Sequence, residues 1–185
     1  MASRRRKPDF PVGQARRFLE PGPVVLVTSA WKGQRDIMTL GWQTVMEFSP
    51  SLVGCLISSV NNSFELIRGS GECVINLPTV ELVDAVVKIG NSSGVDIDKF
   101  EAFGLTPGQA DVVVAPLIEE CHAAFECRLH DDALVERYNF FVFEIVKARA
   151  AARPVHPKTL HYMGEGAFMV AGDVIQRKAL FTKVR

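Results

Sequence analysis

The stretch that decides the fold is Val24-Val25-Leu26-Val27-Thr28-Ser29, a short apolar run rich in β-branched residues. The turn residues Lys32-Gly33-Gln34 follow it closely. A short β-branched run bounded by turn residues is typical of a buried strand. The sequence therefore predicts a strand that opens a β-hairpin.

Two more strands are expected next along the chain. The return strand of the hairpin covers Asp36 to Thr39 and continues through Gly41 and Trp42. A third strand, Leu52 to Ser59, follows the turn at Ser49-Pro50-Ser51. Parallel neighbours need a crossover of about a dozen residues or more, so strands joined by such tight turns form an antiparallel sheet.

A helix is expected after the third strand. Asn62 is a good N-cap, and Glu65 completes a capping-box pattern, while Gly69 and Gly71 supply the C-terminal stop. The further expected elements are a strand from Glu72 to Leu77, a helix from Val80 to Ile89 capped by Thr79, a short helix from Asp96 to Phe103, and strands from Ile118 to Leu129 and from Tyr138 to Ala148 that pair around Asp131-Asp132.

Strands dominate this pattern, so we expect a mainly β fold: a β-barrel with a few short α-helices. A barrel is favoured over an open sheet because closure removes exposed sheet edges. The 185 residues suit one domain over residues 1–185, and 48% hydrophobic with 23% charged residues is typical of globular proteins.

Charge and hydropathy exclude several classes of protein. The formal net charge is zero, from 21 basic and 21 acidic residues, which argues against a nucleic-acid binder. No apolar stretch reaches the roughly 18 residues of a membrane span, and no apolar segment typical of a signal peptide is present. We expect a cytoplasmic protein with a flexible basic tail over residues 1–11, which holds Arg4 to Lys7, and a short helix over Val12 to Leu19.

The cysteines and histidines indicate neither a metal site nor a nucleophile. Cys55 and Cys73 lie in apolar runs and are expected to be buried thiols. Cys121 and Cys127 differ by six positions and are expected on one face of a strand, with His122 on the other face. We therefore expect structural thiols, no disulfide and no metal. The GxSxG and GxGxxG motifs are missing as well, so no catalytic residue is predicted.

The segment Ser58-Ser59-Val60-Asn61-Asn62-Ser63 lies between a strand end and a helix start. The first N–H groups of a helix have no acceptor within it, and with the helix dipole they form a site for an anion. Hydroxyl and amide side chains add further donors for a phosphate monoester. An ordinary capped helix after a polar turn explains the same residues equally well.

The segment Ile37-Met38-Thr39-Leu40-Gly41-Trp42 is irregular for a core strand. Glycine within a strand often marks a place where a ligand approaches the backbone closely. A flavin ring needs backbone or hydroxyl donors along one edge and apolar contacts along the other. The alternative is a β-bulge with a packed tryptophan.

These motifs resemble a known family. Asp36-Ile37-Met38-Thr39-Leu40-Gly41-Trp42 is similar to the N-x-M-T-x-x-W segment of the flavin reductase-like, FMN-binding split-barrel family, which includes the flavoredoxin group. The other matching stretches are Ser63-Phe64-Glu65-Leu66-Ile67 (T-x-E-L-I), Val74-Ile75-Asn76-Leu77-Pro78 (V-N-I-P), Asp98-Lys99-Phe100-Glu101 through Gly104-Leu105-Thr106-Pro107 (D-K-F-E-x-x-G-L-T-P), Ala115-Pro116-Leu117-Ile118 and Glu126-Cys127. The likeness runs in order over roughly residues 20 to 150.

The resemblance implies a six-stranded antiparallel split barrel and a homodimer with FMN near the subunit interface. It implies that the segment from Thr39 to Trp42 borders the flavin ring and that the turn from Ser58 to Ser63 holds the phosphate. The expected cofactor-binding residues are Met38, Thr39, Leu40, Gly41, Trp42, Ser58, Ser59, Asn61, Asn62, Ser63, Asn76 and Lys99.

Three departures from the family pattern are visible. The C-terminal stretch His161-Tyr162-Met163-Gly164 follows the family only loosely. The turn before the helix carries Ser58, Ser59, Asn61 and Asn62 where family members often have Arg or Lys, so the phosphate would depend on neutral donors and the helix end. Asp36 stands where the family has Asn, which places a carboxylate near the ring segment.

The expected function is that of an FMN-binding oxidoreductase, an NAD(P)H:flavin reductase in which hydride passes from NAD(P)H to FMN. The flavin supplies the chemistry, which agrees with the lack of a catalytic constellation. The alternatives are a flavoredoxin-like electron carrier with firmly bound FMN, and a non-enzymatic split-barrel binding module. Expected partners are a second subunit, flavin, pyridine nucleotide, and an electron-acceptor protein or oxygenase.

Overall fold

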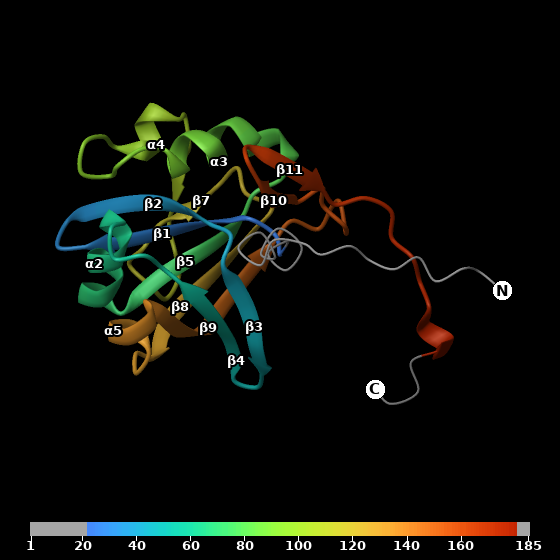
Figure 1. Cartoon of the computed structure of the whole chain (residues 1–185), viewed down its shortest axis with the longest axis horizontal. Helices are drawn as coiled ribbons and strands as arrows, with labels where there is room; N and C mark the ends of the chain where they lie inside the picture. Colours follow the sequence, from blue (N-terminus) through green and yellow to red (C-terminus); the bar gives the residue numbers. More distant parts are fainter. Residues whose placement is uncertain (1–21, 181–185) are drawn as a thin grey trace, which may run out of the picture.

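The computed structural model of the chain describes residues 22–180 (Figure 1). The expected basic tail over residues 1–11 and the expected helix from Val12 to Leu19 lie outside the described residues. Within residues 22–180, no helix combines the length and the apolar character needed to span a membrane.

The main element is a seven-stranded antiparallel sheet with the order β2-β1-β5-β8-β9-β4-β3. Its strands are β1 (Val25–Trp31), β2 (Gln34–Leu40), β3 (Gln43–Phe48), β4 (Ser51–Leu56), β5 (Glu72–Leu77), β8 (Ala123–Asp131) and β9 (Phe140–Ala150). The mainly β, antiparallel fold is confirmed, although the main sheet has seven strands where six were expected.

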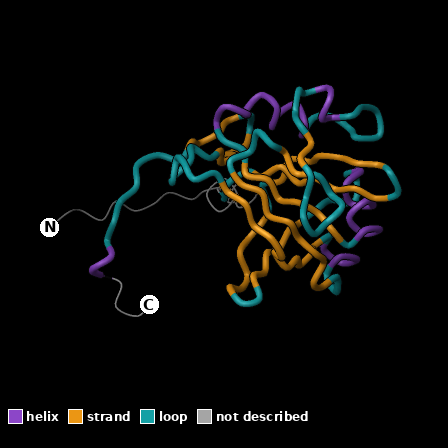
Figure 2. The backbone as a smooth tube through the Cα atoms, turned by 180° about the vertical axis from the view of Figure 1, so that it is seen from behind, coloured by secondary structure: helices purple, strands orange, loops and turns teal. Residues whose placement is uncertain are grey.

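The two edge strands of this sheet are neighbours in the chain. β2 ends at Leu40 and β3 begins at Gln43, so only Gly41 and Trp42 separate them. The sheet must curl for so short a link to join its opposite edges, and Figure 2 shows the strands curving around a common centre. No ladder joins β2 to β3 among the described residues. The result is a split barrel that is open between its two edge strands.

The first half of β1 is buried on both faces, which agrees with the unbroken apolar run from Val24 to Val27. Val25 and Val27 belong to the cluster inside the barrel, whereas Val24 and Leu26 pack into a second cluster on the outside. Successive side chains of a strand point to opposite faces, so one run supplies two cores. The hairpin expected from this run is confirmed, with Val25 opposite Leu40 and Trp31 opposite Gln34.

Short helices lie around the barrel, and η3 lies apart from it on the C-terminal segment (Figure 1). They are α2 (Asn62–Ser70), η2 (Val80–Leu82), α3 (Val83–Gly90), α4 (Lys99–Ala102), α5 (Val135–Tyr138) and η3 (Lys178–Leu180). Phe64 and Ile67 of α2 pack into the inner cluster, and the Phe64 ring meets the edge of the Phe141 ring at 5.3 Å. Val86 and Ile89 of α3 pack into the outer cluster.

Two small sheets complete the fold. One pairs β6 (Pro107–Gly108) with β7 (Leu117–Ile118), and the other pairs β10 (Leu160–Gly164) with β11 (Ala167–Val170). The β10–β11 hairpin lies beside α3 in Figure 1. Leu160 of β10 is buried in the outer cluster, so this late segment returns to the surface of β1.

Several local expectations were wrong. The strand expected from Ile118 to Leu129 is interrupted, because β7 ends at Ile118 and β8 begins only at Ala123. The second strand does not continue through Gly41 and Trp42, because the chain turns there and starts β3. The N-cap of α2 is Asn61, not Asn62, and its side chain makes no capping hydrogen bond. Cys121 precedes β8 and packs into the outer cluster, so it does not share a strand face with Cys127, which lies in the inner cluster.

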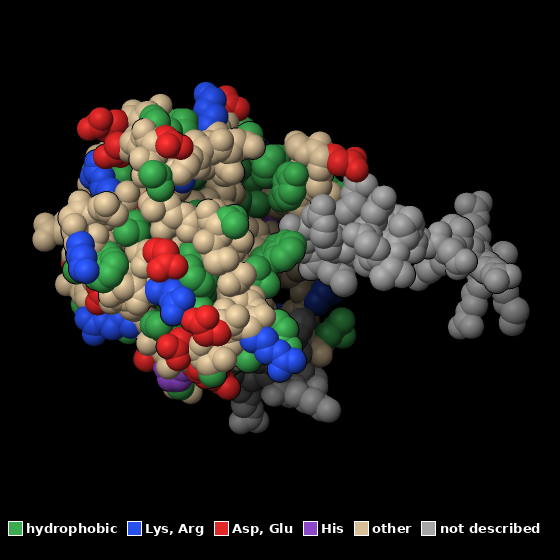
Figure 3. Space-filling model, turned by 60° about the vertical axis from the view of Figure 1, so that its left-hand side comes forward, with side chains coloured by type: hydrophobic (Ala, Val, Ile, Leu, Met, Phe, Trp, Pro, Cys, Tyr) green, Lys and Arg blue, Asp and Glu red, His purple; other side chains and the backbone are tan. Residues whose placement is uncertain are grey.

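The cysteines, the residues that could bind a metal, and the surface charges are described next. All four cysteines are free thiols, and Cys55, Cys73 and Cys127 are buried. None of the described His, Cys, Asp and Glu side chains form a group of three or more suited to a metal ion. Basic and acidic side chains lie interspersed on the face shown in Figure 3, without a large patch of one sign.

Candidate functional site

A pocket of about 620 Å³ lies at the open edge of the barrel. One wall is the end of β2 with the following corner, residues 38–42, and the turn residues Ser58 and Asn61 lie at one end. The opposite wall comes from α3 and the β10–β11 hairpin, including Val86, Tyr162 and Phe168. The volume is within the range of roughly 300–1,000 Å³ that is usual for ligand pockets.

The backbone of β2 turns polar groups toward this open edge. Ile37 uses both of its main-chain groups on that side: its N–H donates to Asp36 Oδ1 at 2.7 Å, and its carbonyl accepts from Lys99 Nζ at 2.6 Å. Main-chain groups of a strand alternate in direction with a period of two residues. The N–H and carbonyl of Thr39 are therefore directed to the same edge, within the wall of the pocket.

The Thr39 side chain connects two walls of the pocket. Its hydroxyl donates to the carbonyl of Val86 at 2.7 Å, which fastens β2 to α3. Gly90 of α3 lies so close that a Cβ there would stand 3.4 Å from the Thr39 Cβ. The hydroxyl proton is thus engaged by the protein, and the main chain of Thr39 is the better donor for a ligand.

The turn before α2 has a defined shape and no charge. The Asn61 main-chain N–H donates to the Ser58 carbonyl at 3.0 Å, and the Asn61 side-chain amide donates to the same carbonyl at 3.2 Å. The Asn61 side chain does not cap α2. The first N–H groups of the helix, at the positive end of its dipole, therefore face the turn without a bond to that side chain. No Asp, Glu, Lys, Arg or His is among the described residues that line the pocket.

Seven of the twelve residues expected at the cofactor line this pocket together. They are Met38, Thr39, Leu40, Gly41, Trp42, Ser58 and Asn61. Ser59 is exposed in the same turn, next to Ser58. The pocket therefore unites the two segments that the sequence indicated separately.

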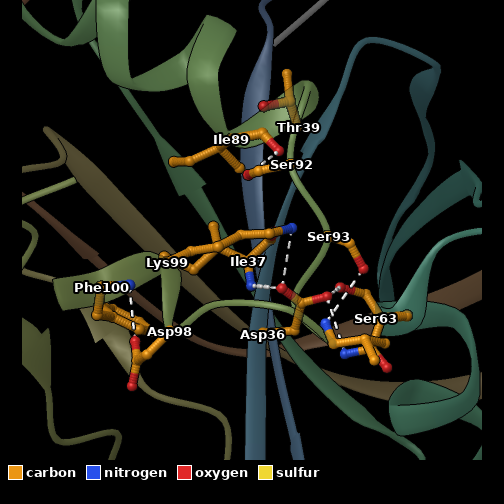
Figure 4. A network of polar contacts seen from close by, with 12 residues as sticks. Asp36, Ile37, Thr39, Ser63, Ile89, Ser92, Ser93, Asp98, Lys99 and Phe100 are labelled. Atoms are coloured by element: carbon orange, nitrogen blue, oxygen red, sulfur yellow. Dashed lines mark hydrogen bonds and ion pairs between the residues drawn. The ribbon is translucent and has the colours of Figure 1, made fainter. Parts of the chain in front are cut away.

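Four expected residues lie outside this pocket and are engaged within the protein. Ser63 is fully buried, and its hydroxyl donates to Asp36 Oδ2 at 3.0 Å. The Asn62 amide donates to the same oxygen at 3.2 Å. Lys99 is buried with its ammonium 3.0 Å from Asp36 Oδ1 (Figure 4).

Asn76, the fourth of these residues, joins strands inside the fold. Its side chain is fully buried, and its amide nitrogen donates to the carbonyls of Leu26 and Val74, each at 3.2 Å. Its amide oxygen accepts from the Ile118 N–H at 3.0 Å. This set of bonds ties β1, β5 and β7 together.

Sequence reasoning missed the wall opposite β2. Val86, Val87, Gly90 and Asn91 come from α3, which was expected as a helix but not at the site. Tyr162 and Phe168 come from the β10–β11 hairpin, and their ring centroids are 5.2 Å apart. Their distance from Thr39 along the chain leaves no local sequence signal, apart from the aromatic residues on either side of the Gly164-Glu165-Gly166 turn.

An exposed ion pair joins β2 to the start of α4. Asp98 caps α4 by accepting from the N–H groups of Phe100 and Glu101, and Arg35 of β2 donates to it at 2.6 Å. The hydrogen bond from Arg35 lowers the pKa of Asp98 below its ordinary value. Asp98 therefore stays ionised at neutral pH and caps α4, whose first residue is Lys99.

Fold and site together define a class: an antiparallel split barrel with an uncharged pocket at its open edge. Residues 16–170 match the model of the flavin reductase like domain, so the chain belongs to the flavin reductase-like family.

Similar proteins agree with this assignment. The uncharacterized protein YddH of Escherichia coli (strain K12) is 34% identical over 172 residues, which cover 85% of this chain and 91% of that protein. The structure of flavoredoxin from Methanosarcina acetivorans has a TM-score of 0.81 at 24% identity and covers 96% of this chain and 98% of that one. An FMN-binding domain of a flavin reductases-like enzyme from Shewanella baltica OS155 has a TM-score of 0.78 at 24% identity, covering 91% and 95%. At this identity the two structures establish the fold.

Proposed function

We propose that this protein is an NAD(P)H-dependent flavin reductase that binds FMN in the pocket at the open edge of the barrel. Reduced nicotinamide would give a hydride, and with one proton FMN would become its two-electron reduced form. The observation that carries the proposal is the union of the β2 edge, residues 38–42, with the turn at Ser58 and Asn61 around one pocket.

The residues of the pocket suit the parts of FMN. The main-chain N–H and carbonyl of Thr39 suit the polar edge of the flavin ring, and Met38, Leu40 and Val86 offer apolar contacts for the remainder. The neutral turn with Ser58, Ser59 and Asn61, at the positive end of α2, suits the phosphate.

The chain's own residues would bind FMN, orient its ring and shield the ring from water. When bound, FMN would supply the hydride-accepting chemistry, as cofactors generally do. Val86 and Phe168 are apolar and would exclude water from the ring. The described lining offers no carboxylate, imidazole or thiol, and its hydroxyl groups are those of Thr39, Ser58 and Tyr162.

We also propose that the protein is a homodimer. Val45, Met46 and Phe48 of β3 are 69%, 47% and 89% exposed, and we call these three residues the β3 face. Exposed apolar patches commonly mark contacts between proteins. β3 follows directly on Trp42 of the pocket, so a second copy on the β3 face would lie next to the flavin site.

Two measurements test the proposed function. The first is a titration of the protein with FMN, followed by flavin fluorescence, in which we expect saturable binding. The second is anaerobic stopped-flow mixing of the FMN complex with NADH and with NADPH, in which we expect fast bleaching by at least one nucleotide. Firm FMN binding with slow bleaching by both would favour an electron carrier instead, and no FMN binding would overturn the proposal.

A further inference from the structure

A buried carboxylate below the pocket receives four donors. Asp36 is 3% exposed. Its Oδ1 accepts from the Ile37 N–H at 2.7 Å and lies 3.0 Å from the Lys99 ammonium. Its Oδ2 accepts from Ser63 Oγ at 3.0 Å and from Asn62 Nδ2 at 3.2 Å. Figure 4 shows Lys99 and Ser63 reaching the carboxylate from different elements.

These donors join the two segments that form the pocket. Asp36 and Ile37 immediately precede Met38, where the pocket wall of β2 begins. Asn62 and Ser63 immediately follow Asn61, where the turn ends. One carboxylate therefore sets the position of the β2 edge relative to the turn before α2.

Lys99 completes the junction from a third element. Its ammonium lies against the Asp36 carboxylate and also donates to the Ile37 carbonyl at 2.6 Å. The Ile37 carbonyl lies two residues before Thr39, so both residues direct their main-chain groups to the open edge of β2. The loop before α4 closes over the pair: a Cβ on Gly94 would lie within 3 Å of the Asp36 carboxylate.

A buried ion pair is a poor means of adding stability, since an apolar pair of similar volume often serves as well. Its particular effect is geometric, because a fully bonded carboxylate fixes the directions of all its donors. We propose that Asp36 and Lys99 are positioning residues, whose ion pair holds the β2 edge and the turn before α2 at the spacing that FMN requires. This inference rests on the proposed function.

The competing explanation is that Lys99 binds the flavin phosphate directly. The two explanations differ in what they expect for Asp36→Asn. A direct ligand loses nothing when its carboxylate partner is neutralised, whereas a positioning pair fails when either member is changed. Residues that act as a unit also give strongly non-additive effects in a double variant.

The experiment measures the Kd for FMN and the visible circular dichroism of bound FMN in Asp36→Asn, Lys99→Met and the double variant. We expect each single variant to weaken FMN binding between about tenfold and a hundredfold, as displacement of a binding group by about 1 Å can do. The double variant is expected to be no weaker than the worse single variant. The dichroism of bound flavin should change, which a loss of stability alone would not produce.

Arg35→Gln is the matched control. It removes the exposed ion pair with Asp98, which joins the same two elements, β2 and α4, but leaves the Asp36 carboxylate and its donors in place. We expect its Kd for FMN to stay within about twofold of the wild type, as is usual for an exposed ion pair.

Ser63→Ala provides a milder variant in case either single charge change prevents folding. It removes one donor to Asp36 and should weaken FMN binding at least about twofold. Unchanged Kd values in all folded variants, or a loss confined to Lys99→Met, would overturn the inference. Both results presuppose that the wild type binds FMN; failure of that titration would instead overturn the proposed function.

Discussion

The hydroxyl of Thr39 donates a hydrogen bond to the main-chain carbonyl of Val86 at 2.7 Å, and this bond crosses between two walls of the pocket. β2 and α3 come from separate parts of the chain, yet the pocket exists only where they are held side by side. The same threonine presents its main chain to the open sheet edge. One residue thus fastens the wall and lines it.

Thr39→Val should separate these two roles. Valine keeps the shape but cannot donate to Val86, so we expect the free energy of unfolding to fall by about 1 kcal/mol. FMN affinity should fall by no more than about fivefold, because the main-chain groups remain. Urea unfolding and FMN titration are the measurements, with Thr39→Ser as the control that keeps the hydroxyl. A loss of FMN binding by a hundredfold in Thr39→Val alone would show that the hydroxyl itself contacts the flavin.

The uncharged turn predicts a modest preference for FMN over riboflavin. Neutral donors to a charged group contribute about 1.5–3 kcal/mol, so riboflavin should bind weaker by roughly ten- to a hundredfold. Ser59 is exposed in this turn, and Ser59→Lys should tighten FMN binding by up to about fivefold at low salt. Riboflavin is the control, because it lacks the phosphate. Equal effects on both ligands would place the phosphate elsewhere.

Asn76→Ala should affect stability and leave the ligand site intact. In the wild type the Ile118 N–H donates to the Asn76 amide oxygen inside the fold. The variant leaves this buried N–H without its acceptor. We expect a loss of about 1–3 kcal/mol in the free energy of unfolding. The Kd for FMN should be unchanged, since Asn76 is fully buried away from the pocket lining. Weaker FMN binding with unaltered stability would instead assign Asn76 to the cofactor.

The fold could be predicted because its decisive signals are local. The run from Val24 to Ser29, with a turn immediately after it, predicts the β1–β2 hairpin from neighbouring residues alone. β3 was missed because its residues from Thr44 to Phe48 are exposed and show no alternation between buried and exposed positions. Because β3 was missed, the corner at Gly41 and Trp42 was taken for a continuation of β2.

The site could be predicted only where one segment forms it. The turn at Ser58 and Asn61 was identified correctly as part of a polar strand-to-helix junction, and it lines the pocket. The sequence did not indicate that the Ser63 hydroxyl donates to Asp36 and not to a phosphate. Asp36 lies 27 positions away and comes close to Ser63 only in the folded chain. Tyr162 and Phe168 were missed because only the return of β10 to β1 brings them to the pocket.

The cysteines should be inert in the folded protein. Burial raises the pKa of Cys121 to about 12, and burial also raises the pKa of Cys55. A hydrogen bond with Cys127, followed by burial, raises the pKa of Cys73. A solution at pH 8 is below the pKa of these three thiols, so they remain protonated. Only the thiolate form is a nucleophile. Reaction with Ellman's reagent should be slow in the native protein and reach four thiols in guanidinium chloride. A fast equivalent in the native protein would contradict this expectation.

The proposed dimer can be tested at Phe48, the most exposed residue of the β3 face. Phe48 is 89% exposed, and Phe48→Glu would place a carboxylate in the proposed contact without disturbing the core of the chain. Burying an unpaired charge is costly, so the dimer dissociation constant should rise by at least about tenfold. Val114→Glu is the matched control, because Val114 is 75% exposed on the loop that Glu72 holds to β5. Sedimentation equilibrium at several concentrations gives the mass of each variant. A wild type that sediments as a single chain, or a Phe48→Glu variant as dimeric as Val114→Glu, would remove the β3 face as the contact between copies.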